Sequence, residues 1–238
     1  MRASDWEFKN RAAIFGCIFG VSFFLSSIDH VNSASWLASQ LGAATGTNED
    51  LIARILFALA AVLVILAAIV RTWGSAYLKS EVVYASEIKT AALVADGPYR
   101  HMRNPLYFGN VLMGLGIGAL ASRTGFIVLQ VLMLIFCYRL ILREEAELRA
   151  AQGEQYDAFM KAVPRLCPAF TPRIPSASGK ANWAAGFRAE GWVWCFALAV
   201  TLFAITLKMK VFLFVLAVLG IFFTVAFALK ANTPGHSD

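Results

Sequence analysis

The sequence predicts an all-α integral membrane protein with about six transmembrane helices, on two observations. First, 59% of the 238 residues are hydrophobic and only 15% are charged, whereas about 25% are charged in a typical soluble domain. Second, six apolar runs approach the roughly 20 residues that a helix needs to cross a bilayer. These runs are residues 12–28, 51–70, 106–121, 125–142, 191–207 and 211–229.

The positions of Lys and Arg predict which helix ends face the cytoplasm. Residues 29–50 contain neither, and with both termini inside, all but four of the 21 Lys and Arg residues fall on the cytoplasmic side. Cytoplasmic loops of membrane proteins carry such an excess. We therefore expect residues 71–105 and 143–190 to be cytoplasmic, in the cytoplasmic membrane of a prokaryote. The net charge of +6 is then an orientation signal, and no nucleic-acid partner is expected.

Residues 106–142 are predicted to form a helical hairpin, because a polar turn at Ser122 to Gly125 separates two apolar runs. The first run reaches only about 24 Å at 1.5 Å per residue, so the hairpin should be tight. Gly114 and Gly118 are four residues apart, a spacing that lets helices approach closely. The same small residues leave a second possibility open, which is a gap that admits a lipid chain from the bilayer.

A cytoplasmic helix is predicted over residues 143–161, continuing the fourth apolar run. An amphipathic pattern is formed by Leu148, Gln152, Tyr156 and Phe159. Prolines from Pro164 to Pro175 then impose an extended path, and residues 79–96 are expected to form a short strand or a lid. The predicted division of the chain is residues 1–92, a core over 93–175, and a linker with a C-terminal hairpin over 176–238.

Polar residues collect at one end of the hairpin. Residues 97–109 read Gly-Pro-Tyr-Arg-His-Met-Arg-Asn-Pro-Leu-Tyr-Phe-Gly, and the fourth apolar run ends in a cluster of charge. The charged residues are Arg139, Arg143, Glu144, Glu145 and Glu147. Charge at the mouth of a membrane hairpin is costly and marks a candidate functional site.

Several of these residues also have a purely structural explanation. Arg100 and Arg103 are either anchors for lipid phosphates or guanidinium forks that bind a carboxylate. Pro105 suits the first turn of a helix, and Asn104 before it is a candidate N-cap. Tyr107 is either a core aromatic or part of a pocket.

Two kinds of site are not expected. The three histidines and four cysteines lack the spacing of metal ligands. The glycine-rich string from Gly114 to Gly118 lies inside an apolar run, not between a strand and a helix, so no Rossmann-type nucleotide site is predicted.

Three segments between Leu93 and Pro168 together resemble the isoprenylcysteine carboxyl methyltransferase family. They are GPYRHMRNPLYFG, REEAELRAAQGEQYDAF and VPRLCP. The resemblance extends more distantly to membrane phospholipid N-methyltransferases. One departure is Asn104, where the family often has His, although His101 is nearby. The resemblance implies an S-adenosylmethionine-dependent methyltransferase that acts on a hydrophobic acceptor, first of all a prenylcysteine-type carboxylate.

The resemblance also implies roles for individual residues. The expected catalytic residues are Arg103, Asn104 and Glu144. The expected cofactor-binding residues are Tyr99, His101, Arg103, Asn104, Pro105, Tyr107, Glu144, Glu145, Tyr156 and Arg165. Spacing does not decide whether Glu144 or Glu145 faces the cofactor, since neighbours lie about 100° apart on a helix. Tyr156 and Phe159 are either walls for the adenine ring or ordinary core residues.

Other functions stay open at this point. The acceptor is alternatively a phospholipid amine or a small thiol, and the expected partners are a lipidic or prenylated acceptor and membrane lipids. A transporter or assembly subunit is the non-enzymatic alternative. A transporter should carry ionisable residues near the middle of its helices, and the sequence places its charges at the helix ends instead.

Overall fold

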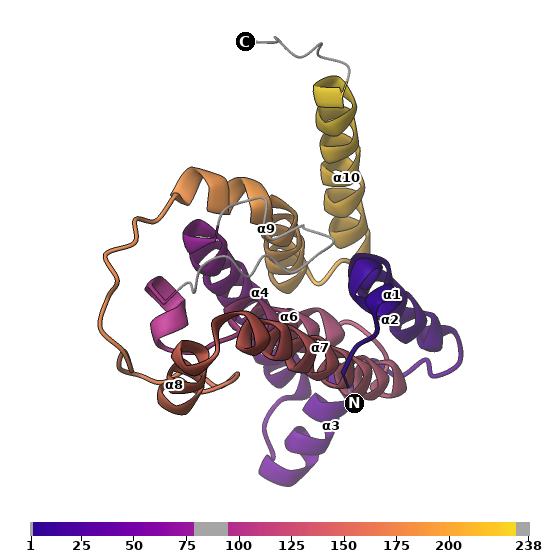
Figure 1. Ribbon diagram of the computed structural model, residues 1–238. Helices are drawn as coiled ribbons and strands as arrows, with labels where there is room; N and C mark the ends of the chain where they lie inside the picture. The colour runs from indigo at the N-terminus through magenta and orange to yellow at the C-terminus, as the bar shows by residue number, and fades with distance from the viewer. Residues whose placement is uncertain (1, 79–94, 232–238) are drawn as a thin grey trace.

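The computed structural model describes residues 2–78 and 95–231, and these residues form helices joined by loops (Figure 1). The helices are α1 (Asp5–Lys9), α2 (Arg11–Phe24), η1 (Leu25–Ser27), α3 (Ser33–Thr45), α4 (Glu49–Tyr77), η2 (Gly97–Arg100), α6 (Pro105–Gly118), α7 (Arg123–Gln152), α8 (Glu154–Ala162), α9 (Trp183–Thr206) and α10 (Met209–Ala231). Within the described ranges, the β pairing is limited to one isolated bridge between Asn32 and Ser122. The all-α prediction is therefore confirmed for this part of the chain.

Each of the six predicted apolar runs lies mainly in a helix, but within the described residues three of these helices count as candidate membrane spans. α4, α7 and α9 are long and apolar enough to cross a membrane. α2 and α6 have 14 residues each, or about 21 Å at 1.5 Å per residue. The part of α10 whose side chains the structure describes, Met209–Ile221, is also shorter than a span. The structure thus supports a membrane protein and leaves the number of six spans a prediction.

α4 is the central helix of the bundle. α6 and α9 pack along it, α7 packs against α6 and α2, and α10 contacts α9 while extending away from the rest (Figure 1). Val64 of α4 and Val193 of α9 are fully buried in the shared core. Gly116 of α6 faces α4 so closely that a Cβ there would overlap Val64. Small residues at such crossings let helix backbones approach.

The two possibilities for Gly114 and Gly118 are decided by their neighbours on α7. A Cβ on Gly118 would lie 3.0–3.1 Å from the side chains of Phe126, Gln130 and Leu129. A Cβ on Gly114 would be in van der Waals contact with Gln130 and Met133. Close helix packing is therefore confirmed, and the predicted gap at these two glycines is wrong.

The predicted helix over residues 143–161 is broken in two. Gly153 has a positive φ of 55°, which glycine adopts without a steric penalty, and it separates α7 from α8. The predicted apolar face is present nonetheless: Tyr156, Phe159 and Val163 form a small core with Leu148 packed against it. α8 therefore folds back onto the end of α7.

Residues 163–182 form an extended segment, which we call the strap, between α8 and α9 (Figure 1). Backbone hydrogen bonds hold it against η2: the N–H of Ala169 donates to His101 O at 2.9 Å, and the N–H of Arg173 donates to Arg100 O at 2.8 Å. The extended path predicted from the prolines is confirmed. The strand or lid predicted over residues 79–96 falls almost wholly outside the described residues.

Candidate functional site

The candidate site lies where η2, the start of α6, the end of α7 and the strap meet. Gly97 sets this corner, because its φ of 56° suits glycine and a Cβ there would overlap the Tyr77 ring at the end of α4. Pro98 follows as the second residue of η2, in the first turn, where its missing N–H costs nothing. The Gly-Pro pair thus docks the polar segment onto α4.

Glu145 is the centre of a buried charged cluster. Glu145 is only 5% exposed. Two nitrogens of Arg165, Nε and Nη2, each lie 2.9 Å from Glu145 Oε2. Arg103 Nε lies 3.3 Å from its Oε1, and Asn104 Nδ2 donates to Oε1 at 3.1 Å. Residues predicted from three separate segments therefore meet around one carboxylate, which we call the Glu145 cluster.

Arg103 is the member of this cluster with an unaligned donor. Its side chain is 7% exposed, yet its Nε has no well-aligned hydrogen bond to any described residue. The cluster also contains two guanidinium groups, from Arg103 and Arg165, against the single carboxylate of Glu145. A buried guanidinium with one unaligned donor, in a cluster where two guanidiniums face one carboxylate, suits an anionic ligand group.

Asn104 does not cap α6 with its side chain, so that prediction is wrong. It occupies the N-cap position without a side-chain hydrogen bond to the helix. Its Nδ2 instead donates to Glu145 Oε1 and, at 3.0 Å, to Arg165 O. Asn104 therefore joins the start of α6 to α7 and the strap, while Pro105 takes the first helical position as predicted.

Glu144 and Glu145 point to different partners. Glu144 Oε1 accepts a hydrogen bond of 2.5 Å from the Tyr107 hydroxyl, whereas Glu145 binds the two arginines. The angle of about 100° between neighbours on a helix produces this division. The site thus contains an arginine-bound carboxylate and, beside it, a tyrosine-bound carboxylate.

His101 and Asp96 attach the strap. His101 Nδ1 lies 2.8 Å from Ala169 O, and since a carbonyl only accepts, this ring nitrogen carries the proton. Asp96 accepts hydrogen bonds from Ser176 Oγ at 2.5 Å and from the N–H of Gly179 at 2.7 Å. These bonds outweigh the effect of burial and lower the pKa of Asp96.

The predicted aromatic residues are buried instead of lining an open face. Tyr99 is 8% exposed and Tyr156 2%. Burial raises the pKa of both phenols, so both rings are neutral at physiological pH. Tyr156 lies 5.8 Å from Phe159, centroid to centroid, which favours the packing role for both over an adenine wall.

The N-terminal helix α1 covers the outer side of α7 next to the site. Glu7 receives two hydrogen bonds from Arg139 Nη2, at 2.9 and 2.7 Å. Hydrogen bonding to Arg139 is the largest effect that lowers the pKa of Glu7 to about 2. Arg143 bridges Asp5 at 2.8 Å and Glu147 at 2.9 Å. Arg139 and Arg143 are thus paired with acidic residues of α1 and α7.

An apolar groove of about 370 Å³ runs along α7 beside the site. It is lined by Leu134, Ile135, Cys137, Tyr138, Arg139, Ile141, Leu142 and Leu166. The Tyr138 hydroxyl accepts a hydrogen bond of 2.8 Å from Arg165, so one wall of the groove touches the Glu145 cluster directly.

One buried ion pair was missed by the reading of the sequence. Arg71, predicted to be a cytoplasmic orientation marker, is 7% exposed, and Glu190 is fully buried. Arg71 Nε lies 2.7 Å from Glu190 Oε2. Both residues directly flank predicted apolar runs, 51–70 and 191–207, but the sequence did not indicate that they pair. A usable signal was Glu190 itself, a lone acid directly before the apolar run 191–207, since such residues are seldom left unpaired.

Comparisons with known proteins place part of this chain in context. It is 29% identical over 118 residues to the cobalt-zinc-cadmium resistance protein CzcN of Cupriavidus metallidurans, covering 50% of each chain. It is 30% identical over 92 residues to the nickel-cobalt-cadmium resistance protein NccN of Alcaligenes xylosoxydans xylosoxydans, covering 39% of this chain and 41% of that one. The chain thus spans about half the length of the curated relatives it matches. No solved structure matches.

A family model also matches this chain, and its description is phospholipid methyltransferase. The match covers residues 55–155, which include most of α4 and all of η2, α6 and α7, together with Arg71, Arg103, Glu144 and Glu145. Arg165, Glu190 and the strap lie outside it. The helices that carry most of the candidate site are therefore similar to the phospholipid methyltransferase family, and this likeness suggests a membrane methyltransferase.

Proposed function

We propose that this protein is an S-adenosylmethionine-dependent methyltransferase of the membrane, with its site on the cytoplasmic side. The observation that carries the proposal is the Glu145 cluster, in which the buried Arg103 has an Nε without an aligned acceptor among the described residues. This residue lies in a segment that matches a methyltransferase family. The amino-acid portion of the cofactor has a carboxylate, and a guanidinium fork binds both oxygens of such a group.

The residues present fit that cofactor. Arg103 would hold the carboxylate, and Arg165 and Asn104 keep Glu145 in place beside it. Glu145 holds the guanidinium of Arg103 from its other side, which restricts the orientation of that side chain. S-adenosylmethionine, when bound, supplies a methyl group carried on a sulfonium centre.

Tyr107 and Glu144 would act on the acceptor side of the site. Their hydrogen bond of 2.5 Å fixes both side chains, and alignment of reacting groups can supply several kcal/mol of a barrier. Burial of Tyr99 keeps water out of the same corner. A carboxylate acceptor needs no proton removed. An amine acceptor does, and Glu144 is positioned to accept that proton.

The apolar groove along α7 supports a hydrophobic acceptor. Its lining is almost wholly aliphatic or aromatic, and its Tyr138 wall is bonded to Arg165 of the cluster. A hydrocarbon chain in this groove would leave its polar head next to Arg165. We propose a prenylcysteine-type carboxylate as the first candidate, because the cluster has a surplus positive charge.

A phospholipid amine is the second candidate acceptor. Two observations favour it: the description of the matching family and the carboxylate of Glu144 held close to Tyr107. A screen of methyl transfer over prenylcysteine analogues and phospholipid extracts decides between the two acceptors.

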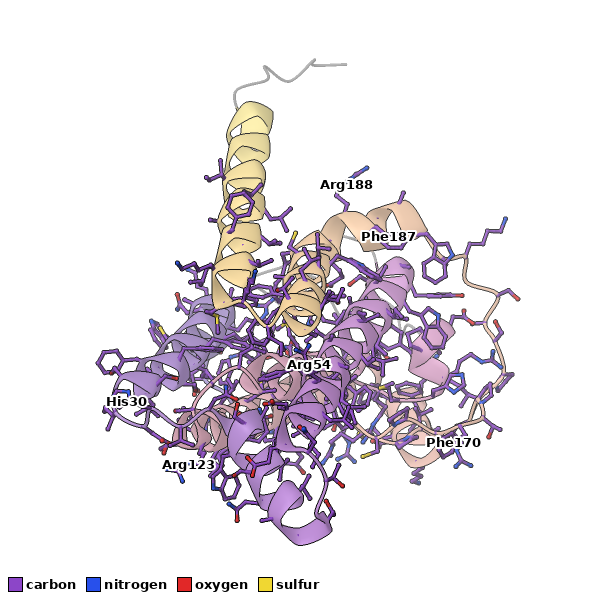
Figure 2. The ribbon with its side chains drawn as sticks, turned by 180° about the vertical axis from the view of Figure 1, so that it is seen from behind. His30, Arg54, Arg123, Phe170, Phe187 and Arg188 are labelled. Atoms are coloured by element: carbon purple, nitrogen blue, oxygen red, sulfur yellow. The ribbon has the colours of Figure 1, made fainter. Side chains whose placement is uncertain are left out.

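The first experiment measures S-adenosylmethionine binding by calorimetry on detergent-purified protein. Arg103→Ala should weaken binding about tenfold to a hundredfold, because a charge-assisted hydrogen bond contributes roughly 1.5–3 kcal/mol. The control is Arg123→Ala, which removes a cation at the opposite side of the bundle from the strap residue Phe170 (Figure 2). No binding by the natural protein, or equal affinity in both variants, would contradict the proposal.

A further inference from the structure

The Arg71–Glu190 pair connects three helices inside the bundle. Glu190 of α9 accepts from Arg71 Nε at 2.7 Å and from Ser75 Oγ at 2.6 Å, both on α4. The Arg71 guanidinium also lies 5.3 Å from the ring centre of Trp192. Glu190 is fully buried, so its charge depends on these partners.

The other arm of Arg71 reaches the first turns of α6. Its Nη1 donates to Asn110 Oδ1 at 2.6 Å and to Leu106 O at 3.1 Å. The stem of the same side chain lies against Gly109, where a Cβ would overlap it. The Arg71 side chain therefore fixes the position of this end of α6 along the helix axis and its rotation about that axis.

We propose that Arg71 and Glu190 are positioning residues for methyl transfer, acting through the first turn of α6 on Tyr107 and Glu144. Leu106, whose carbonyl Arg71 binds, directly precedes Tyr107. A rotation of this turn would therefore carry the Tyr107 hydroxyl away from Glu144. Glu190 belongs to α9, which lies outside the matched residues 55–155. The proposal therefore adds α9 to the helices that position the reacting groups. This inference rests on the proposed function.

The cofactor side of the site should be less affected by the pair. The Glu145 cluster is held from α7 and the strap, through Arg165 and through the N–H of Arg103, which donates to Pro164 O at 2.9 Å. Loss of the Arg71 contacts is thus expected to lower the transfer rate more than the cofactor affinity. If the pair only held helices together, its loss would not lower the transfer rate selectively over the cofactor affinity.

A second polar contact between α4 and α9 provides a matched control. Trp194 Nε1 donates to Thr72 Oγ1 at 3.0 Å, and neither side chain has a hydrogen bond to α6 within the described residues. Trp194→Phe/Thr72→Val removes this link between the same two helices. The control therefore separates general helix joining from positioning of α6.

The test compares this control with Arg71→Met/Glu190→Leu, a double variant that leaves no unpaired charge. Replacing a buried ion pair with apolar residues often keeps or raises stability. The expected result is a transfer rate about a hundredfold lower, with cofactor affinity close to that of the natural protein, while the control keeps its rate. Equal losses in both double variants, or a rate unchanged by the charge-free pair, would overturn the inference.

Asn110→Ala covers the case in which the charge-free pair does not fold. It removes one contact between Arg71 and α6 and leaves the ion pair to Glu190 in place. A slower transfer with unchanged cofactor affinity and an unchanged melting temperature supports the inference, and an unchanged rate overturns it. Failure of the proposed function is a separate result, because the natural protein would then bind no S-adenosylmethionine.

Discussion

Two buried charged groups among the described residues differ in their charge balance. In the Arg71 group, one guanidinium faces one carboxylate, and Ser75, Asn110 and a backbone carbonyl provide further hydrogen bonds. In the Glu145 cluster, two guanidiniums share one carboxylate, and Arg103 Nε is left without an aligned acceptor among the described residues. A group whose positive and negative charges are equal in number is suited to holding helices together. A group with an extra positive charge is suited to binding an anionic ligand.

The largest effect should come from breaking the balanced group on one side only. Arg71→Ala leaves Glu190 buried without its partner, which is expected to lower the free energy of unfolding by about 3–5 kcal/mol. Thermal unfolding in detergent measures this. Arg139→Ala, which breaks the partly exposed pair with Glu7, should cost at most about 1 kcal/mol. If both variants lose the same stability, the contrast between buried and surface pairs does not hold here.

An intermediate effect is expected from neutralising each glutamate of the site. Glu145→Gln leaves the buried Arg103 and the partly exposed Arg165 without their carboxylate. Arg103 then loses its orientation, and cofactor affinity should fall about tenfold, or 1.4 kcal/mol. Glu144→Gln weakens only the partner of Tyr107 and should lower the transfer rate with little change in affinity. Calorimetry measures the affinity of both variants, and a transfer assay measures their rates. If Glu144→Gln lowered the affinity and Glu145→Gln only the rate, the two assigned roles would be wrong.

The smallest effect concerns the attachment of the strap and depends on pH. Because hydrogen bonds lower the pKa of Asp96 in the folded protein, its ionised form stabilises the fold above the unfolded pKa of about 3.9. This contribution is lost as pH falls through the lower folded value. Proteolysis after Lys180 should therefore accelerate below about pH 4, and Asp96→Asn should remove that dependence. Cleavage that is independent of pH in the natural protein would contradict this.

The sequence predicts the helices well because apolar runs and turn residues are local signals. It also brings the correct polar segments together, since Arg103, Asn104, Glu145 and Arg165 all meet in the structure. Pairing across helices is not a local signal, and so the partner of Arg71, 119 residues away, was missed. For the same reason the division of labour between Glu144 and Glu145 required coordinates.

Two further predictions show the limits of local rules. Asn104 has a favourable residue type and position for a helix cap, but a buried carboxylate and the Arg165 carbonyl compete for its amide and win. The continuous helix over residues 143–161 has a regular apolar pattern, but Gly153 allows a sharp break that the pattern does not reveal. The membrane orientation and the three-part division of the chain stay predictions.

The contact between Gly97 and Tyr77 has a consequence for how this protein tolerates change. Because the end of α4 touches the start of η2, the chain returns at residue 97 to the place it left at residue 77. A larger side chain at residue 97 would therefore separate the end of α4 from the start of η2 and displace the polar segment that begins there.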